Sequence, residues 1–171
     1  PIRQADLQKM RDAITAVLPE YTNSPDDDAN WVESGDYRFF VGADEAGHPV
    51  GIAFIATSKE GYGGTLETMV GLLPEGIINS IQVLKHAETP GLGTKVTEEP
   101  FKGQFDGASM DNRTLFVAKD NRGSADKPPI DAVTGATISS RAVTDSVRAG
   151  LEYYLAHKDE ILGGVGKVEP D

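Results

Sequence analysis

The sequence predicts an α+β domain in which a mainly antiparallel sheet is accompanied by an N-terminal helix and by a second helix near the C-terminus. Apolar residues recur at helical spacing near both ends of the chain, whereas short segments rich in β-branched and aromatic residues fill the middle. Strands and helices do not alternate, which argues against a doubly wound parallel sheet of the Rossmann or flavodoxin kind. With 171 residues the chain can bury one core, so we expect a single domain over residues 1–171.

The first helix is predicted over about residues 5–18. Four apolar side chains share one face at helical spacing: Leu7, Met10, Ile14 and Val17. Pro19 ends this pattern, because proline cannot continue a helix. The acidic run at residues 26–28 lacks the alternating ligands, the central Gly and the distal Glu of a calcium loop, so we expect no metal site there.

The middle of the chain carries the predicted strands. They cover residues 37–42, 50–57, 66–72, 76–86 and 113–119. The first two should form a hairpin through the turn residues 44–47. The segment at residues 119–129 is rich in Gly, Pro, Asn and Ser and is predicted to be a loop.

Composition excludes several classes of function. The 27 acidic and 16 basic residues give a net charge of −11, which repels phosphate backbones, so nucleic acid is not an expected partner. Cysteine is absent, which removes disulfides, thiolate metal sites and cysteinyl flavins. No apolar run is long enough to cross a bilayer, and the chain as given is expected to be soluble.

The helix near the C-terminus is the clearest periodic signal and begins at residues 137–140. Five side chains are predicted to share its core face: Val143, Val147, Leu151, Tyr154 and Leu155. The first N–H groups of a helix lack intrahelical partners and the helix dipole is positive there, so a phosphate bound at this end would be stabilised. A glycine turn followed by Thr and Ser is equally an ordinary capped helix start.

The residues around this helix start fit a longer pattern, Asp-x-x-Ser/Thr-Gly-Ala-Ser/Thr-x-Ser/Thr. Every specified position is matched, by Asp131, Thr134, Gly135, Ala136, Thr137 and Ser139. The stretch resembles the covalent flavinylation motif of the FMN-binding domain family, which includes subunits of the Rnf complex and of the sodium-translocating NADH:quinone reductase. The resemblance implies FMN joined by a phosphoester to Thr137, with the other five residues forming the pattern that a flavin transferase reads.

Two glycine-bearing stretches also resemble signatures of this family, in the family's order. The first is Gly61-Tyr62-Gly63-Gly64, where Tyr62 could stack on the flavin or bond to it, or where the loop could simply connect two strands. The second runs from His86 to Gly93. Its residues Glu88, Thr89, Gly91, Leu92 and Gly93 are implied to lie at the isoalloxazine ring. As plain sequence, its Pro-Gly pair is a tight turn, and His86 serves either a local hydrogen bond or proton donation.

The function that the resemblance implies is electron transfer within a membrane-bound, ion-translocating oxidoreductase complex. We favour the Rnf type over the quinone-reductase type, because this compact chain leaves little room for large insertions. The implied partners are the other subunits of the complex and, during maturation, a flavin transferase that uses FAD and Mg²⁺. The family holds its flavin domain on the outer face of the bacterial cytoplasmic membrane by one N-terminal helix, which we expect to precede Pro1, unless the protein is a natively soluble relative. Thr137 would be an anchor without substrate turnover of its own.

Two other classes of function stay open on the sequence. One is an extracytoplasmic ligand-binding or interaction module without a cofactor. The other is a serine hydrolase, in which Ser139 or Ser140 would act with His86 and Asp131. No Gly-x-Ser-x-Gly elbow surrounds either serine, which counts against the hydrolase.

Overall fold

The computed structural model describes residues 4–27, 30–61, 64–85 and 93–163 and contains one five-stranded sheet. The strands are β1 (Trp31–Ser34), β2 (Tyr37–Ala43), β3 (Pro49–Gly61), β4 (Gly64–Leu72) and β5 (Ile78–Lys85). Each strand pairs antiparallel with the next one along the chain, so the order across the sheet is β1-β2-β3-β4-β5. The sheet is therefore a meander of hairpins, as expected for short connections between antiparallel strands.

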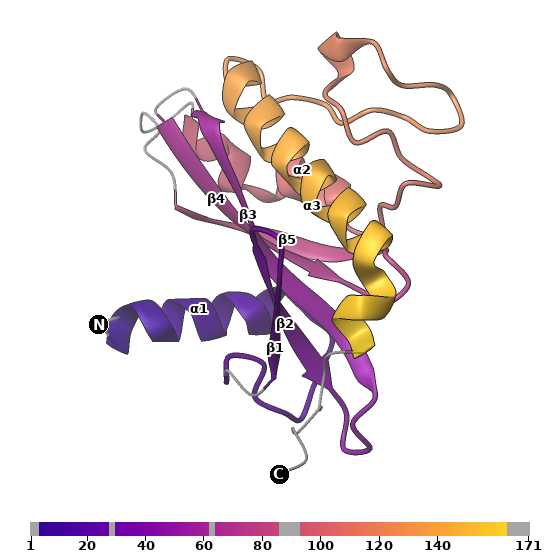
Figure 1. Ribbon diagram of the computed structural model, residues 1–171. Helices are drawn as coiled ribbons and strands as arrows, with labels where there is room; N and C mark the ends of the chain where they lie inside the picture. The colour runs from indigo at the N-terminus through magenta and orange to yellow at the C-terminus, as the bar shows by residue number, and fades with distance from the viewer. Residues whose placement is uncertain (1–3, 28–29, 62–63, 86–92, 164–171) are drawn as a thin grey trace.

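Helical segments surround this sheet. They are α1 (Gln4–Val17), η1 (Gly93–Thr97), α2 (Glu99–Lys102), η2 (Gly103–Phe105), η3 (Ala118–Asp120) and α3 (Thr137–Gly163). Figure 1 shows the long helix α3 running along the sheet, while α1 approaches it from the other side. The α+β class, the mainly antiparallel sheet and the two flanking helices are confirmed. Among the described residues, no helix combines the length and the apolar character needed to cross a membrane.

The main core lies between the sheet and α3. Phe39, Phe54 and Val70 pack there from neighbouring strands, and all three are fully buried. The helix contributes Val143 and Val147, which are also fully buried. Alternate residues of a strand point to opposite faces, so Phe39 faces α3 while the next residue turns to the other side.

A smaller core lies between the sheet and α1. Ile14 and Val17 of the helix pack with Phe40 and Met69 of the sheet. Gly71 of β4 allows this close approach, since a Cβ atom there would overlap the Val17 backbone. The helix ends where Asn79 donates a side-chain hydrogen bond of 2.8 Å to the Val17 carbonyl.

The predicted strand at residues 113–119 is wrong. Only Val117 forms a bridge, an isolated parallel one to Ile130, and η3 follows at once. The neighbouring chain carries Pro128 and Pro129, which have no N–H group and cannot extend a ladder. Leu115 and Val117 are buried in the core, whereas Phe116 is only partly buried and Ala118 is exposed.

Two smaller predictions also need correction. The chain around Trp31 is not among the predicted strands but forms β1, a short strand that pairs with β2 through a turn at Gly35, where φ is 58°. Leu155 is predicted on the core face of α3 but is 39% exposed, whereas Tyr154 is fully buried. Adjacent helix positions point about 100° apart, so both could not face the sheet; Leu155 instead covers Gly76 just after β4.

Candidate functional site

The predicted phosphate-binding segment is a tight turn that leads directly into α3. The N–H of Ala136 donates a 2.9 Å hydrogen bond to the carbonyl of Val133, which closes the turn. Gly135 occupies its third position with φ of 82°, a conformation that costs glycine little and other residues more. Ala136 is only 7% exposed, so a small side chain suits this position. Helix α3 then begins at Thr137, as predicted.

Thr137 is the accessible hydroxyl at the helix start. Its side chain is partly exposed, whereas Ser139 and Ser140 are 1% and 0% exposed. Within the part of the chain that the structure describes, neither the Thr137 hydroxyl nor the N–H groups of Thr137 and Ile138 form a hydrogen bond. A free hydroxyl therefore lies beside two free amides at the positive end of α3, which is helical from Thr137 until a kink at His157.

Ser140 connects the turn to the helix. Its hydroxyl accepts a 2.9 Å hydrogen bond from the N–H of Val133 and donates a 2.8 Å hydrogen bond to the carbonyl of Ala136. The N–H of Ser140 donates to the same carbonyl at 2.9 Å, which is the first helical bond. The hydroxyl is therefore fully used inside the protein and does not offer the free nucleophile that the hydrolase alternative requires.

Asp131 opens the motif with an exposed side chain and a fixed backbone. The side-chain amide of Gln104 donates to the Asp131 carbonyl at 2.9 Å and accepts from the Asp131 N–H at 2.8 Å. Arg113 in turn donates to the Gln104 side-chain oxygen at 3.3 Å and to the Pro129 carbonyl at 3.0 Å. Residues distant in sequence thus hold the chain just before the turn.

Two open cavities flank the helix start. The one beside Asp131 has a volume of about 490 Å³ and carries the cations of Lys95 and Arg113. The other, of about 260 Å³, lies beside Ile138 and reaches Ser58 and Glu60 at the end of β3. Ile138 is 48% exposed, so an apolar side chain lies open to solvent directly after Thr137. One cavity thus borders the segment before the turn and the other borders the first residues of α3, although Thr137 itself lines neither.

The second cavity is bounded by an ion pair that reaches from the helix to the preceding loop. The guanidinium of Arg141 binds Asp120 of η3 through two nitrogens, at 3.1 Å and 3.0 Å from the same carboxylate oxygen. This contact ties the loop before the motif to the first turn of α3. It also pairs the Arg141 cation with a carboxylate, so this cation adds little to the positive field of the helix start.

The two other predicted contact regions lie largely outside the described residues. These are Tyr62, His86, Glu88, Thr89, Gly91 and Leu92. Gly61 pairs with Gly64 where β3 meets β4, and β5 ends at Lys85 opposite Glu67 on the same end of the sheet. Gly93 begins η1, which contacts α3. The described residues at the ends of these two regions allow both to lie near Thr137. The predicted contacts of both regions with the flavin stay predictions.

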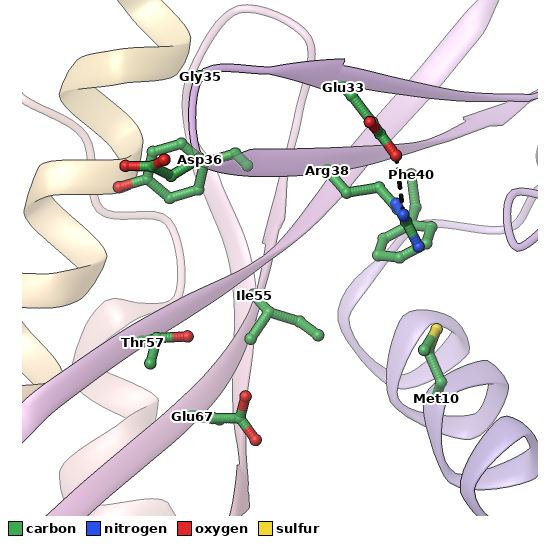
Figure 2. A pocket seen from close by; sticks show the side chains of 10 residues that line it. Met10, Glu33, Gly35, Asp36, Arg38, Phe40, Ile55, Thr57 and Glu67 are labelled. Carbon is green, nitrogen blue, oxygen red and sulfur yellow. Dashed lines mark hydrogen bonds and ion pairs between the residues drawn. The ribbon is translucent and has the colours of Figure 1, made fainter. Parts of the chain in front are cut away.

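A third cavity, of about 400 Å³, lies on the opposite face of the sheet and is separate from Thr137. Figure 2 shows Met10 of α1 on one side of it and the Glu33–Arg38 ion pair of the β1–β2 hairpin on another. Arg38 also lies over the Trp31 ring, 4.1 Å from its centre. In the described ranges no group of three or more acidic or histidine side chains could hold a metal ion.

Comparison with known proteins identifies the family. The model of the FMN-binding domain matches residues 61–152, which is more than half of the chain. The chain belongs to the FMN-binding domain family. The matched range includes both glycine-bearing stretches, the loop before the motif, and most of α3.

Relatives in this family share about a third of their aligned residues with the chain. The G subunit of a proton-translocating ferredoxin:NAD(+) oxidoreductase complex from Clostridium ljungdahlii is 38% identical over 102 residues, 59% of this chain. The match spans about half of that relative, 52% of its length. The G subunit of an ion-translocating oxidoreductase complex from Methanosarcina acetivorans is 32% identical over 163 residues, covering 91% of this chain and 79% of the relative.

Solved structures share the fold. The C subunit of the Na⁺-translocating NADH-quinone reductase from Parabacteroides distasonis has a TM-score of 0.61 at 17% identity, with 92% of this chain and 98% of that chain covered. NqrC from Shewanella oneidensis has a TM-score of 0.53 at 21% identity, with 95% and 76% covered. At these identities the similarity concerns the fold.

Sequence reasoning finds the motif but not the residues that hold it. Gln104 and Arg113 lie 27 and 18 residues before Asp131 and match no pattern. The only local signal is the spacing of Phe101 and Phe105, whose rings pack edge to face at 5.6 Å and which predicts one helical turn around Gln104. For Ser140 the sequence suggests only a nucleophile, whereas the structure gives its hydroxyl a place in the hydrogen bonds of the turn.

Proposed function

We propose that this domain carries FMN on Thr137 through a phosphoester bond and passes electrons as a subunit of an ion-translocating oxidoreductase complex. The supporting observation is the partly exposed hydroxyl of Thr137, unbonded within the described chain, at the first residue of α3 in a fully matched motif. Membership of the FMN-binding domain family gives the identity of the group.

The residues at the helix start suit a phosphorylated flavin. Gly135 and Ala136 present little bulk, so backbone and ligand can approach closely. The free N–H groups of Thr137 and Ile138 are donors for phosphate oxygens at a helix N-terminus. The exposed side chain of Ile138 offers the flavin an apolar contact. When bound, FMN supplies the one- and two-electron chemistry, and the domain's own residues fix its position and solvent exposure.

Attachment is a group transfer without change of oxidation state. The Thr137 oxygen forms a bond to the phosphorus of the FMN half of FAD, the phosphate–phosphate bridge breaks, AMP leaves, and the hydroxyl proton is released. A threonine hydroxyl is a weak nucleophile and no histidine or carboxylate bonds to it among the described residues, so activation must come from a separate transferase with Mg²⁺. Thr137 is accordingly an attachment point and not a catalytic residue.

The complex is proposed from the relatives. The curated relatives named above are G subunits at 32% and 38% identity, whereas the two structural neighbours are C subunits at 17% and 21%. The Rnf type is therefore the better match, as expected from the compact chain. Location on the outer face of the cytoplasmic membrane, through an N-terminal helix in the full protein, follows from the same resemblance. Protease treatment of cells stripped of their outer layers should cleave the domain while the cytoplasm stays intact.

Co-expression with a flavin transferase tests attachment. The protein should gain the mass of one FMN less water and fluoresce in a denaturing gel, whereas Thr137→Val should do neither. Thr137→Ser, which keeps the hydroxyl, should still be modified. An unmodified wild-type chain beside a transferase that modifies a second substrate would overturn the proposal and favour a module without cofactor.

A further inference from the structure

The hydroxyl of Ser140 does more than a serine inside a helix ordinarily does. A helical serine commonly donates back to the carbonyl four residues earlier, as Ser140 does to Ala136 at 2.8 Å. Here the same oxygen also accepts the N–H of Val133 at 2.9 Å, and the side chain is fully buried. The hydroxyl thus closes residues 133–136 onto the first turn of α3.

Gln104 performs the same task at the start of the motif. Its side-chain amide pairs with both backbone groups of Asp131, at 2.9 Å and 2.8 Å, much as a neighbouring strand would. Arg113 fixes that amide by donating to its oxygen at 3.3 Å. The segment from Asp131 to Ala136 is therefore held at both of its ends by side chains that lie outside the six specified motif positions.

We propose that Ser140 and Gln104 are positioning residues that hold residues 131–136 in the shape from which Thr137 accepts its flavin, so that the transferase modifies the folded domain. This inference rests on the proposed function and adds that the domain is already folded when Thr137 accepts the flavin. A segment containing glycine has high conformational freedom when unconstrained, and ordering it during encounter with the transferase would slow the reaction. Preorganisation by these side-chain hydrogen bonds removes that cost before the transferase arrives.

The hydrogen bonds of Ser140 and Gln104 show that these residues position the segment and do not contact the reacting hydroxyl of Thr137. Neither Ser140 nor Gln104 hydrogen bonds to Thr137, whose hydroxyl has no partner in the described ranges. Their effect must pass through the backbone of Val133 and Asp131. Loss of either side chain should therefore loosen a specific amide and slow transfer together, without changing the site of attachment.

The experiment measures flavin transfer onto the purified full chain by a purified transferase with FAD and Mg²⁺. Initial rates come from in-gel flavin fluorescence, and final occupancy comes from intact mass. Ser140→Ala and Gln104→Met should each slow transfer by about tenfold, because the backbone groups of Val133 and Asp131 lose the side-chain partners that hold them, while reaching the wild-type mass at long times. Hydrogen exchange should be faster at the Val133 amide in Ser140→Ala and at the Asp131 amide in Gln104→Met.

Two matched variants serve as controls. Ser146 is a partly buried serine of α3 that donates only to the Val143 carbonyl, and Gln8 is an exposed residue of α1 that bonds only to Asp12. Ser146→Ala and Gln8→Met should leave the rate within about twofold of wild type.

The inference fails if the exchange of Val133 or Asp131 rises while the transfer rate stays within about twofold of wild type, because the held shape would then not matter. It also fails if the rate falls with no change in exchange, since the side chains would then act in another way. Gln104→Met decides the question if Ser140→Ala does not fold. A wild-type chain that accepts no flavin overturns the proposed function itself, which separates the two failures.

Discussion

Gly150 of α3 lies directly against the aromatic ring of Phe54 in β3, with no space between them for a methyl group. Both residues are buried, and Phe54 is 0% exposed, so its ring cannot swing out into solvent. This contact sets how closely the helix that begins at Thr137 approaches the sheet.

Gly150→Ala should therefore destabilise the domain. Alanine favours the helix by about 1 kcal/mol relative to glycine, but overpacking a tight core costs about 1–3 kcal/mol, so the net change in the free energy of unfolding should be a loss of about 1 kcal/mol. Urea unfolding monitored by circular dichroism measures it. Gly163→Ala is the control, because a Cβ there meets nothing within 4 Å. A higher stability for Gly150→Ala would show that the helix can shift away from the ring.

Arg148→Lys should cost about 1–3 kcal/mol of folding stability although the charge is kept. The guanidinium of Arg148 lies 3.6 Å from the centre of the Phe116 ring, donates to the Leu115 carbonyl at 2.7 Å and pairs with Asp145 at 2.9 Å. A lysine ammonium cannot stack and donate in this planar arrangement. Arg122→Lys is the matched comparison, since Arg122 is exposed and lies over the same ring at 4.8 Å, and it should change stability by less than about 0.5 kcal/mol. Equal losses in the two variants would contradict this account.

Tyr154 should make the domain sensitive to alkaline pH. Burial, and next the charge of Glu75, raise the pKa of the Tyr154 phenol above its ordinary value, and its hydroxyl donates to the Pro74 carbonyl at 2.6 Å. In the unfolded chain the phenol ionises near about pH 10, so above that pH the folded state binds more protons than the unfolded state. Stability is therefore present below about pH 10 and falls by up to about 1.4 kcal/mol per pH unit above it.

Tyr154→Phe tests this dependence. It should cost about 1 kcal/mol at neutral pH through the lost hydrogen bond, and the stability curve above about pH 10 should become shallower than that of the wild type. Urea midpoints measured across the alkaline range give the two slopes. An unchanged slope would mean that the phenol ionises alike in both states.

Attachment should be confined to Thr137 even when neighbouring hydroxyls are available. In Thr137→Val, Ser139 and Ser140 should remain unmodified, because they are 1% and 0% exposed and Ser140 already uses its oxygen in two hydrogen bonds. Thr134 is exposed but is the second residue of the turn and does not lie at the helix start. Peptide mapping after co-expression with the transferase checks this. Flavin on Ser139 would require the first turn of α3 to open and would contradict the rigid helix start.

The sequence predicts the fold class, both long helices and four of the five strands, because the helices have a clear apolar period and the strands are rich in β-branched and aromatic residues. Residues 113–119 have the composition of a strand, but composition cannot reveal that the facing segment contains Pro128 and Pro129, which limit the pairing to a few hydrogen bonds and one isolated bridge. The strand β1 is not predicted, because it has a pairing partner but lacks a recognisable strand pattern. With four residues it is too short to show a period, and it exists because β2 offers it a hairpin partner.

In the candidate site, too, some features could be predicted from the sequence and others could not. The turn at Gly135 and the helix start at Thr137 could be predicted because the residues that mark them lie within nine consecutive positions. The bonds from Gln104 to Asp131, and from Arg113 to Gln104, depend on how distant loops meet, which a single sequence does not encode in any local pattern. Ser140 is visible in the sequence, but its bond to Val133 depends on the chain turning back at Gly135.

The chain order of the sheet has a consequence for biogenesis. Since each strand pairs with its neighbour in sequence, the meander can assemble progressively as the polypeptide emerges, but the last helix is synthesised after all five strands. The Thr137 hydroxyl is therefore positioned only after the sheet has been synthesised. If the transferase modifies the folded domain, a chain that carries the flavin has already been synthesised and folded. The presence of the flavin would then indicate that folding had succeeded.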